Sequence, residues 1–355
     1  MALNVTQLLE KVYEINASDL YLTINTPPVL RINGALNALE GYDKMKVEDI
    51  EFFLSQVLSQ EQKDLLDLNK EVDFSVALGN KTRFRVNAFY QKGYPAVALR
   101  LVPMIIPSLA SLNLPKAIEH ICELRQGLVL VVGPSGQGKS TTIASMIDQI
   151  NETRSEHIIT IEDPIEYMFV NKKSIIEQRE MYLDTHSWSV ALKSVLRQDP
   201  NIVFIGEMRD FDTISSAITI AETGHLVFAT LHTNSASQTI DRIIDAFPEE
   251  QQKLVRVQLS QIVEAVISMR LLPSAQKGRA PIIELLLGSD AVKNLIREGK
   301  TYQLDNVITT SMHVGMVSLE QSLAESVNKG WIEESEALRT TTKPDILRRM
   351  LGQTK

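Results

Sequence analysis

The segment GPSGQGKSTT at 133–142 has the residue types and spacing that bind a nucleoside triphosphate, because it fits the pattern G-x-x-x-x-G-K-[ST]. The glycines let the backbone turn tightly, so that successive N–H groups face one concavity and can hold phosphate oxygens. Lys139 would place a cation on the terminal phosphates, and Ser140 would offer its hydroxyl to Mg²⁺. An apolar run before the loop and a helical pattern after it argue against an accidental glycine-rich turn. The predicted nucleotide contacts are Gly133, Pro134, Ser135, Gly136, Gln137, Gly138, Lys139, Ser140 and Thr141.

A carboxylate follows a second apolar run, in NIVFIGEMRD at 201–210. There Gly206 and Glu207 come directly after the strand-like residues, where open α/β sheets bind their ligands. Nucleotide hydrolysis needs a carboxylate that orients water and helps to hold the metal. We therefore predict that Glu207 and Ser140 hold Mg²⁺ through the bound nucleotide.

A further acidic group, TIEDPIEY at 160–167, ends another apolar run. Its acids include Glu162 and Glu166, and Pro164 imposes an extended or turning backbone between them. An isolated acidic turn is usually a solvated loop. Its place at the carboxyl end of a strand in the same sheet favours a role at the site instead.

Two histidines bracket the apolar run GHLVFATLHTN at 224–234. In a continuous strand His225 and His232 would point to opposite faces and lie roughly 23 Å apart, at about 3.3 Å per residue, which disfavours a shared metal ion. For His225, a hydrogen-bonded histidine at a strand start remains an alternative to a sensor role. His232 follows the strand at its carboxyl edge, where it could sense the terminal phosphate.

Several arginines could stabilise the transition state, either within the chain or from a neighbouring subunit. A solvated face is the alternative for each. Two of them, Arg83 and Arg85, share one face of a predicted strand. The candidates are Arg197, Arg209 and Arg242, and, nearer the N-terminus, Arg83, Arg85 and Arg100.

The elements that must position these residues form an α/β arrangement. Near-continuous apolar runs, which are typical of parallel strands buried on both faces, occur at 127–133, 157–161, 201–206 and 225–230. Helical patterns separate the runs, so we expect a doubly wound sheet. From about 235 onward we expect mostly helix, apart from a hairpin at 270–287.

The region before residue 103 has a different sequence pattern, in which helical patterns and short strands are joined by turn signals. Short turns imply antiparallel pairing, so we expect a small α+β domain with helices on one side of its sheet. The proline-containing segment that follows is predicted to be a linker. The expected divisions are an N-terminal domain at 1–102, a linker at 103–115, an ATPase core at 116–290 and a helical region at 291–355.

Composition excludes several classes of protein. The chain has 355 residues, 44% of them hydrophobic, and no stretch reaches the roughly 18–20 uncharged apolar residues of a membrane span. Its one cysteine cannot form a disulfide framework or a cysteine-based zinc site within the chain. A net charge of −8 and only 6% aromatic residues disfavour nucleic acid as a partner, and so disfavour a RecA-like nucleic-acid motor. We expect a reducing, cytoplasmic setting.

Taken in order, GPSGQGKSTT, TIEDPIEY, IGEMRD and ETGHLVFATLHTNSASQTIDRIIDAFP resemble the secretion-type ATPases, specifically the type IV pilus retraction ATPases of the PilT and PilU group. The resemblance implies an N-terminal PAS-like domain and a RecA-like ATPase domain that uses ATP and Mg²⁺. It also implies a homohexameric ring motor, peripheral at the inner-membrane pilus base, that acts with a platform protein to disassemble the pilus in twitching motility.

The resemblance also assigns roles. Lys139 and Ser140 belong to the Walker A motif, Glu207 to the Walker B motif, and His225 and His232 to the His box. In the acidic group, we favour Glu166 over Glu162 as the water-activating base, and we count Arg209 among the candidate catalytic residues.

The sequence departs from the family pattern in small ways. Gln137 replaces a small hydroxyl residue, and AVKNLIRE at 291–298 replaces AIRNLIRE. GEMRD resembles PilT, but AVALRLVP, PIIELLL and PDILRRML favour a PilU-like paralogue, which would act with a second retraction ATPase. A nucleotide-dependent scaffold with little turnover of its own is therefore an alternative. The lack of four zinc-binding cysteines favours retraction over extension.

Overall fold

The computed structural model describes residues 4–32, 34–79, 81–102, 105–276 and 278–352, and it divides into two compact units. The first unit comprises Met1–Ile105 and Glu166–Met168, and the second comprises Ile106–Ile165 and Phe169–Lys355. The predicted linker begins with residues 103–104, which lie outside the described residues. The domain boundaries drawn from the sequence stay predictions. Among the described residues, no helix combines the length and the apolar character that crossing a membrane requires.

The first unit is an antiparallel sheet with helices, in the strand order β3-β2-β1-β6-β5-β4. Alternate residues of its longer strands are buried, so one face of the sheet carries the core. Side chains from the three helices join that same buried cluster. The elements are α1 (Val5–Ile15), β1 (Asp19–Leu22), β2 (Val29–Ile32), β3 (Ala35–Ala38), α2 (Val47–Val57), α3 (Gln60–Asn69), β4 (Glu71–Leu78), β5 (Thr82–Gln91) and β6 (Tyr94–Val102).

The second unit contains a 7-stranded sheet in the order β13-β12-β7-β11-β10-β8-β9. Its strand pairs are parallel, except for the antiparallel pair β12–β13. The strands and the elements between them are η1 (Leu109–Leu112), α4 (Ala117–Ile121), β7 (Gly127–Val132), α5 (Lys139–Thr153), β8 (His157–Glu162), β9 (Ile175–Glu180), α6 (Trp188–Val195), β10 (Ile202–Ile205), α7 (Phe211–Glu222), β11 (Leu226–Leu231), α8 (Ala236–Asp245), α9 (Glu249–Ile262), β12 (Val263–Pro273) and β13 (Arg279–Leu287).

Burial on both faces explains the near-continuous apolar runs. In β7, Leu128, Leu130 and Val132 join a core cluster with α6, α7, α8 and α9, whereas Val129 and Val131 join the cluster that contains α5. Every position of such a strand must therefore be apolar. The predicted α/β class, with an N-terminal α+β domain before a domain built on a mostly parallel sheet, is confirmed.

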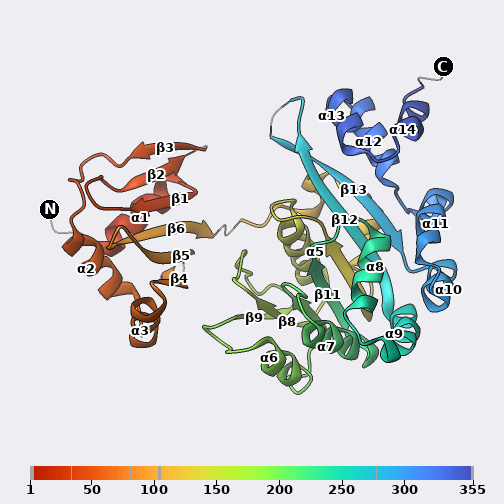
Figure 1. Ribbon diagram of the computed structural model, residues 1–355, viewed down its shortest axis with the longest axis horizontal. Coiled ribbons are helices and arrows are strands. Elements are labelled where there is room, and N and C mark those ends of the chain that lie inside the picture. The colour runs from red at the N-terminus through yellow and green to blue at the C-terminus, as the bar shows by residue number, and fades with distance from the viewer. Residues whose placement is uncertain (1–3, 33, 80, 103–104, 277, 353–355) are drawn as a thin grey trace. The chain divides into compact units, whose positions relative to one another are not determined.

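Helices follow the hairpin to the end of the described chain. They are α10 (Asp290–Glu298), η2 (Thr301–Gln303), α11 (Leu304–Thr310), η3 (Met312–Val314), α12 (Leu319–Asn328), α13 (Glu334–Thr340) and α14 (Pro344–Met350). Figure 1 shows α12, α13 and α14, in dark blue, beside the turn end of the hairpin β12–β13. They form a separate small core with residues of β13.

Three strands differ from the sequence expectations. β3 and β9 were not expected; β9 has the polar sequence IIEQRE and lies at the edge of its sheet, so it lacks the apolar run of a central strand. The hairpin is longer than predicted, because β12 begins at Val263, immediately after α9 ends. Helix was expected there, since the apolar residues of α9 continue into β12. β12 pairs in parallel with β7 and so extends the 7-stranded sheet.

Candidate active site

The phosphate loop connects β7 to α5, as the motif predicts. Gly133 has φ 144°, and a Cβ there would collide with the backbone carbonyl oxygen of Met269 on β12. Gly138, the last residue before α5, has φ 87°. Glycine is needed at both positions because side-chain-bearing residues rarely adopt such backbone angles. The loop therefore packs directly against the hairpin strand and opens at the N-terminus of α5, which favours anions.

Lys139 lies inside the curve of this loop. Its side chain is buried, and its Nζ donates hydrogen bonds to the carbonyl oxygens of Gly133 at 2.7 Å and Pro134 at 3.0 Å. The ammonium is thus held where the loop's backbone N–H groups would face phosphate oxygens. Ser140 follows in the first turn of α5 and is partly exposed.

Glu207 and His232 extend the site across the sheet. The Nδ1 atom of His232 lies 3.5 Å from Nζ of Lys139, and its Nε2 atom lies 3.2 Å from Oε1 of Glu207. Arg209 contacts the other carboxylate oxygen of Glu207 at 2.8 Å. These residues follow β7, β11 and β10, which are neighbours in the sheet, so the parallel strands bring their carboxyl ends together.

The carboxyl group of Glu207 is held in its ionised form. Partial burial raises its pKa, but the hydrogen bond from Arg209 and the charges of Arg209, His232 and Lys139 outweigh burial, so the pKa is lowered from its ordinary value of 4.5. An ionised carboxylate beside a cationic loop has the charge needed to share a metal ion with phosphate groups.

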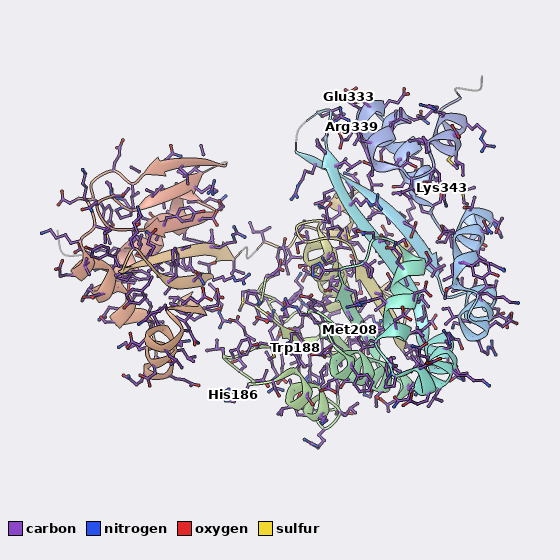
Figure 2. All side chains as sticks on the ribbon, viewed as in Figure 1. His186, Trp188, Met208, Glu333, Arg339 and Lys343 are labelled. Carbon is purple, nitrogen blue, oxygen red and sulfur yellow. The ribbon has the colours of Figure 1, made fainter. Side chains whose placement is uncertain are left out.

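The backbone around Glu207 is fixed by its neighbours. Met208, labelled in Figure 2, donates its N–H to the carbonyl oxygen of Thr230 at 3.0 Å, and the Thr230 hydroxyl donates to the carbonyl oxygen of Gly206. A Cβ at Gly206 would lie 3.1 Å from Cα of Glu162. The glycine between strand and glutamate therefore permits close packing of β10 against β8.

The two candidate glutamates of the acidic group after β8 differ in their burial. Glu162 is buried, and its Oε1 atom accepts hydrogen bonds from Thr160 at 2.7 Å and Gln178 at 3.2 Å. Glu166 is exposed, beyond the cis peptide bond between Asp163 and Pro164.

His225 lies at the opposite end of β11 from His232. Its Nδ1 atom is 3.0 Å from both the carbonyl oxygen of Ile220 and the hydroxyl of Thr223, as in the hydrogen-bonded alternative. Within the described part of the chain, no group of three or more His, Cys, Asp and Glu side chains is arranged to hold a metal ion.

Of the predicted arginines, Arg209 contacts this cluster, through Glu207. Arg197 and Arg242 are exposed, the latter near the end of α8. The other candidates belong to the first unit. There Arg85 and Arg100 are directly opposite each other on β5 and β6, and Arg100 forms an ion pair with Asp19 at 2.9 Å.

Sequence reasoning missed the hairpin residues that support the phosphate loop. The backbone N–H of Leu271 donates to Oε1 of Gln137 at 2.6 Å, and Arg279 donates to the carbonyl oxygen of Gly136 at 2.8 Å. Gln137 thus faces the hairpin. No local pattern could reveal these contacts, because more than 130 positions of sequence separate the partners.

The fold and the site define an ATPase of the P-loop class. The family model for type II/IV secretion system proteins matches residues 2–339, and the chain belongs to this family.

Relatives and a solved structure agree along nearly the whole chain. The chain is 39% identical to the type IV pilus retraction ATPase PilT of Pseudomonas aeruginosa, with 97% of this chain and 99% of the relative covered. It is 37% identical to the type IV pilus ATPase PilU of the same organism, covering 97% and 90%. A crystal structure of the pilus retraction motor PilT with bound ADP matches with TM-score 0.90 and 45% identity, covering 98% of this chain and 99% of that one. The two identities to PilT and PilU do not separate these paralogues.

Proposed function

We propose that this chain hydrolyses ATP with Mg²⁺ and powers type IV pilus retraction as the subunit of a homohexameric ring. The observation that carries the proposal is the line of contacts from Lys139 through His232 to Glu207, which starts inside the phosphate loop. Similarity to PilT over almost the full length of both chains supports the retraction role.

The residues at the loop fit a magnesium ion bound with a nucleotide. Mg²⁺ prefers oxygen ligands, and the Ser140 hydroxyl and the ionised Glu207 carboxylate offer them. When bound, the metal neutralises charge that develops on the phosphates. Lys139 binds the terminal phosphate, and His232, between Lys139 and Glu207, reports its presence.

We assign the water-activating role to Glu166 in preference to Glu162. Oε1 of Glu162 is engaged by Thr160 and Gln178, whereas Glu166 is exposed. A general base must reach the attacking water, and an exposed carboxylate is more accessible to that water than a buried one.

The proposed motor works at the cytoplasmic face of the inner membrane, on a platform protein of the pilus machine. An interface arginine from a neighbouring subunit, among Arg83, Arg85, Arg100, Arg197 and Arg242, would stabilise the transition state. Similarity to PilU supports a second candidate, an accessory ATPase that acts with a paralogous retraction ATPase.

Phosphate release and twitching test the proposal together. Lys139→Ala should abolish both in a strain that lacks its own retraction ATPases, because the loop loses its cation while the fold is kept. Glu166→Gln should bind ATP and fail to hydrolyse it. The control is Lys329→Ala, which removes an exposed lysine of the C-terminal region.

The outcomes separate the candidates. Normal phosphate release by Lys139→Ala would refute the site. Twitching that requires a paralogue, with little phosphate release by this chain alone, would favour the accessory role. Loss of hydrolysis in Glu162→Gln with normal hydrolysis in Glu166→Gln would reverse the choice of base.

A further inference from the structure

The loop between β11 and α8, which carries His232, is held from one face of the hairpin β12–β13. The carbonyl oxygen of Asn234 accepts hydrogen bonds from Ser268 at 3.0 Å and from Arg270 at 3.4 Å. The backbone N–H of Ala236 donates to Oε1 of Glu284 at 2.7 Å. The hairpin therefore forms hydrogen bonds with one acceptor of the loop backbone, the Asn234 carbonyl, and with one donor, the Ala236 N–H.

The three hairpin side chains that bind this loop lie on the same face of the hairpin because of strand geometry. Ser268 and Glu284 are directly opposite each other in the antiparallel pair, and Arg270 is two residues beyond Ser268 on the same strand. Residues two apart in a strand point to the same side. We call Ser268, Arg270 and Glu284 the loop clamp.

One residue of the clamp, Arg270, also forms a hydrogen bond with the C-terminal helices. Arg270 also donates to the carbonyl oxygen of Thr340, the last residue of α13, at 3.1 Å. Beyond it, Lys343, labelled in Figure 2, forms an ion pair with Asp305 at 3.2 Å. One guanidinium therefore connects the His232 loop with the C-terminal helical segment.

The loop's position matters because His232 contacts both the phosphate-loop lysine and Glu207. His232 precedes Asn234 by two residues, so a shift of the Asn234 carbonyl would displace the imidazole of His232. A misplacement of about 1 Å in such a site can cost on the order of a hundredfold in rate.

We propose that Ser268, Arg270 and Glu284 are positioning residues that hold the His232 loop for ATP hydrolysis and connect it to the C-terminal helices. None of them contacts the phosphate loop in the described interactions, so they act through His232. The proposal rests on the proposed ATP hydrolysis.

Steady-state phosphate release distinguishes positioning from a purely structural role. Glu284→Ala removes the acceptor for Ala236 and should lower kcat about tenfold or more, while KM for ATP stays within about twofold. Glu284→Gln keeps an acceptor oxygen and should restore kcat to within about threefold of the parent chain. Because the clamp acts through His232, adding Glu284→Ala to His232→Ala should cause no further loss.

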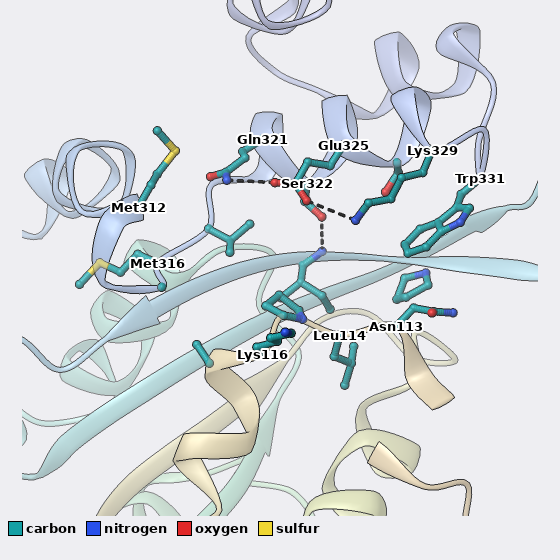
Figure 3. Close-up of a pocket in the computed structure, with 17 residues that line it drawn as sticks. Asn113, Leu114, Lys116, Met312, Met316, Gln321, Ser322, Glu325, Lys329 and Trp331 are labelled. Carbon is teal, nitrogen blue, oxygen red and sulfur yellow. Dashed lines mark hydrogen bonds and ion pairs between the residues drawn. The ribbon is translucent and has the colours of Figure 1, made fainter. Parts of the chain in front are cut away.

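A matched control is Glu325→Ala. Figure 3 shows Glu325 on α12 in a pocket of the C-terminal region, where it pairs with Lys329 and Gln321. This variant loses a carboxylate of the same region and should keep the parent kcat. If Glu284→Ala fails to fold, Ser268→Ala removes a clamp donor with a smaller change in volume, and a lowered kcat is expected there too.

An unchanged kcat in a folded Glu284→Ala variant would overturn the proposal. So would losses that multiply in the double variant with His232→Ala. A parent chain that releases no phosphate would count against the proposed function itself. If the parent chain is active and the clamp variant has the same kcat, the positioning role alone is refuted.

Discussion

At the scale of single residues, Glu284 accepts a hydrogen bond from the His232 loop and has an unusually high pKa. Burial raises its pKa to about 7, and the nearby carboxylates of Asp305 and Glu320 add to that effect; the Ala236 N–H and Arg270 act against it. The ionised form is therefore less favourable in the folded chain than in the unfolded one.

This pKa makes stability depend on pH. The folded pKa lies above the ordinary value of 4.5, so the contribution of Glu284 to stability is fully present below about pH 4.5 and is lost as pH rises through about 7. The free energy of unfolding should fall across that range by up to about 3 kcal/mol more in the parent chain than in Glu284→Gln.

Urea unfolding followed by tryptophan fluorescence at pH 5 and pH 8 measures the difference. Both tryptophans, Trp188 and Trp331, belong to the second unit, so the signal reports the part of the chain that contains Glu284. Equal pH dependence in the two proteins would show that Glu284 does not titrate in this range.

At the scale of elements, the hairpin β12–β13 supports the site from two sides. It bonds to the phosphate loop through Leu271 and Arg279, and to the His232 loop through the clamp. A strand pair that lies beside β7 in the sheet can reach both loops because they leave the sheet at the same edge.

Close packing between this hairpin and the phosphate loop predicts a severe effect of Gly133→Ala. The added Cβ meets the Met269 carbonyl oxygen at φ 144°, so we expect a loss of at least about 2 kcal/mol of stability and loss of ATP binding. Gly330→Ala is the control: its φ of 67° also disfavours alanine, but no atom lies within 4 Å of the added Cβ. It should cost about 1 kcal/mol and leave ATP binding unchanged. Similar thermal midpoints and ATP affinities for both variants would argue against the packing account.

At the scale of the whole molecule, the proposed nucleotide site and the chain's one cysteine belong to the same unit. Cys122 is 4% exposed and packs in the cluster that contains α5. Burial is the main reason that its pKa is raised to about 12. The native thiol is therefore protonated and covered, and it should react with alkylating reagents only when the unit opens.

Nucleotide should consequently slow the labelling of Cys122. Ligand at about 100 times its dissociation constant stabilises the bound form by about 2.7 kcal/mol, which corresponds to roughly hundredfold slower labelling through unfolding. Mass spectrometry of labelled protein with and without ATP and Mg²⁺ checks this. Lys139→Ala should show no slowing, and equal protection in that variant would place nucleotide binding elsewhere.

Local patterns anticipated much of the fold and part of the site. The phosphate loop is contiguous, so its turn, its glycines and Lys139 could be recognised from spacing alone. Glu207 and His232 could be expected near it, because parallel strands end at one edge of a sheet. β9 could not be recognised, because an edge strand with alternate exposure carries few apolar residues.

The sequence by itself determined the α/β class, the nucleotide loop and the strands that carry it, because burial on both faces requires continuous apolar runs. Tertiary structure alone decided which side chains meet across long separations. It paired Gln137 with Leu271, joined Glu284 to Ala236, and bridged the His232 loop to α13 through Arg270. Each of these contacts depends on the placement of the hairpin beside β7. That placement arises from sheet pairing, and no spacing of residues along the chain encodes it.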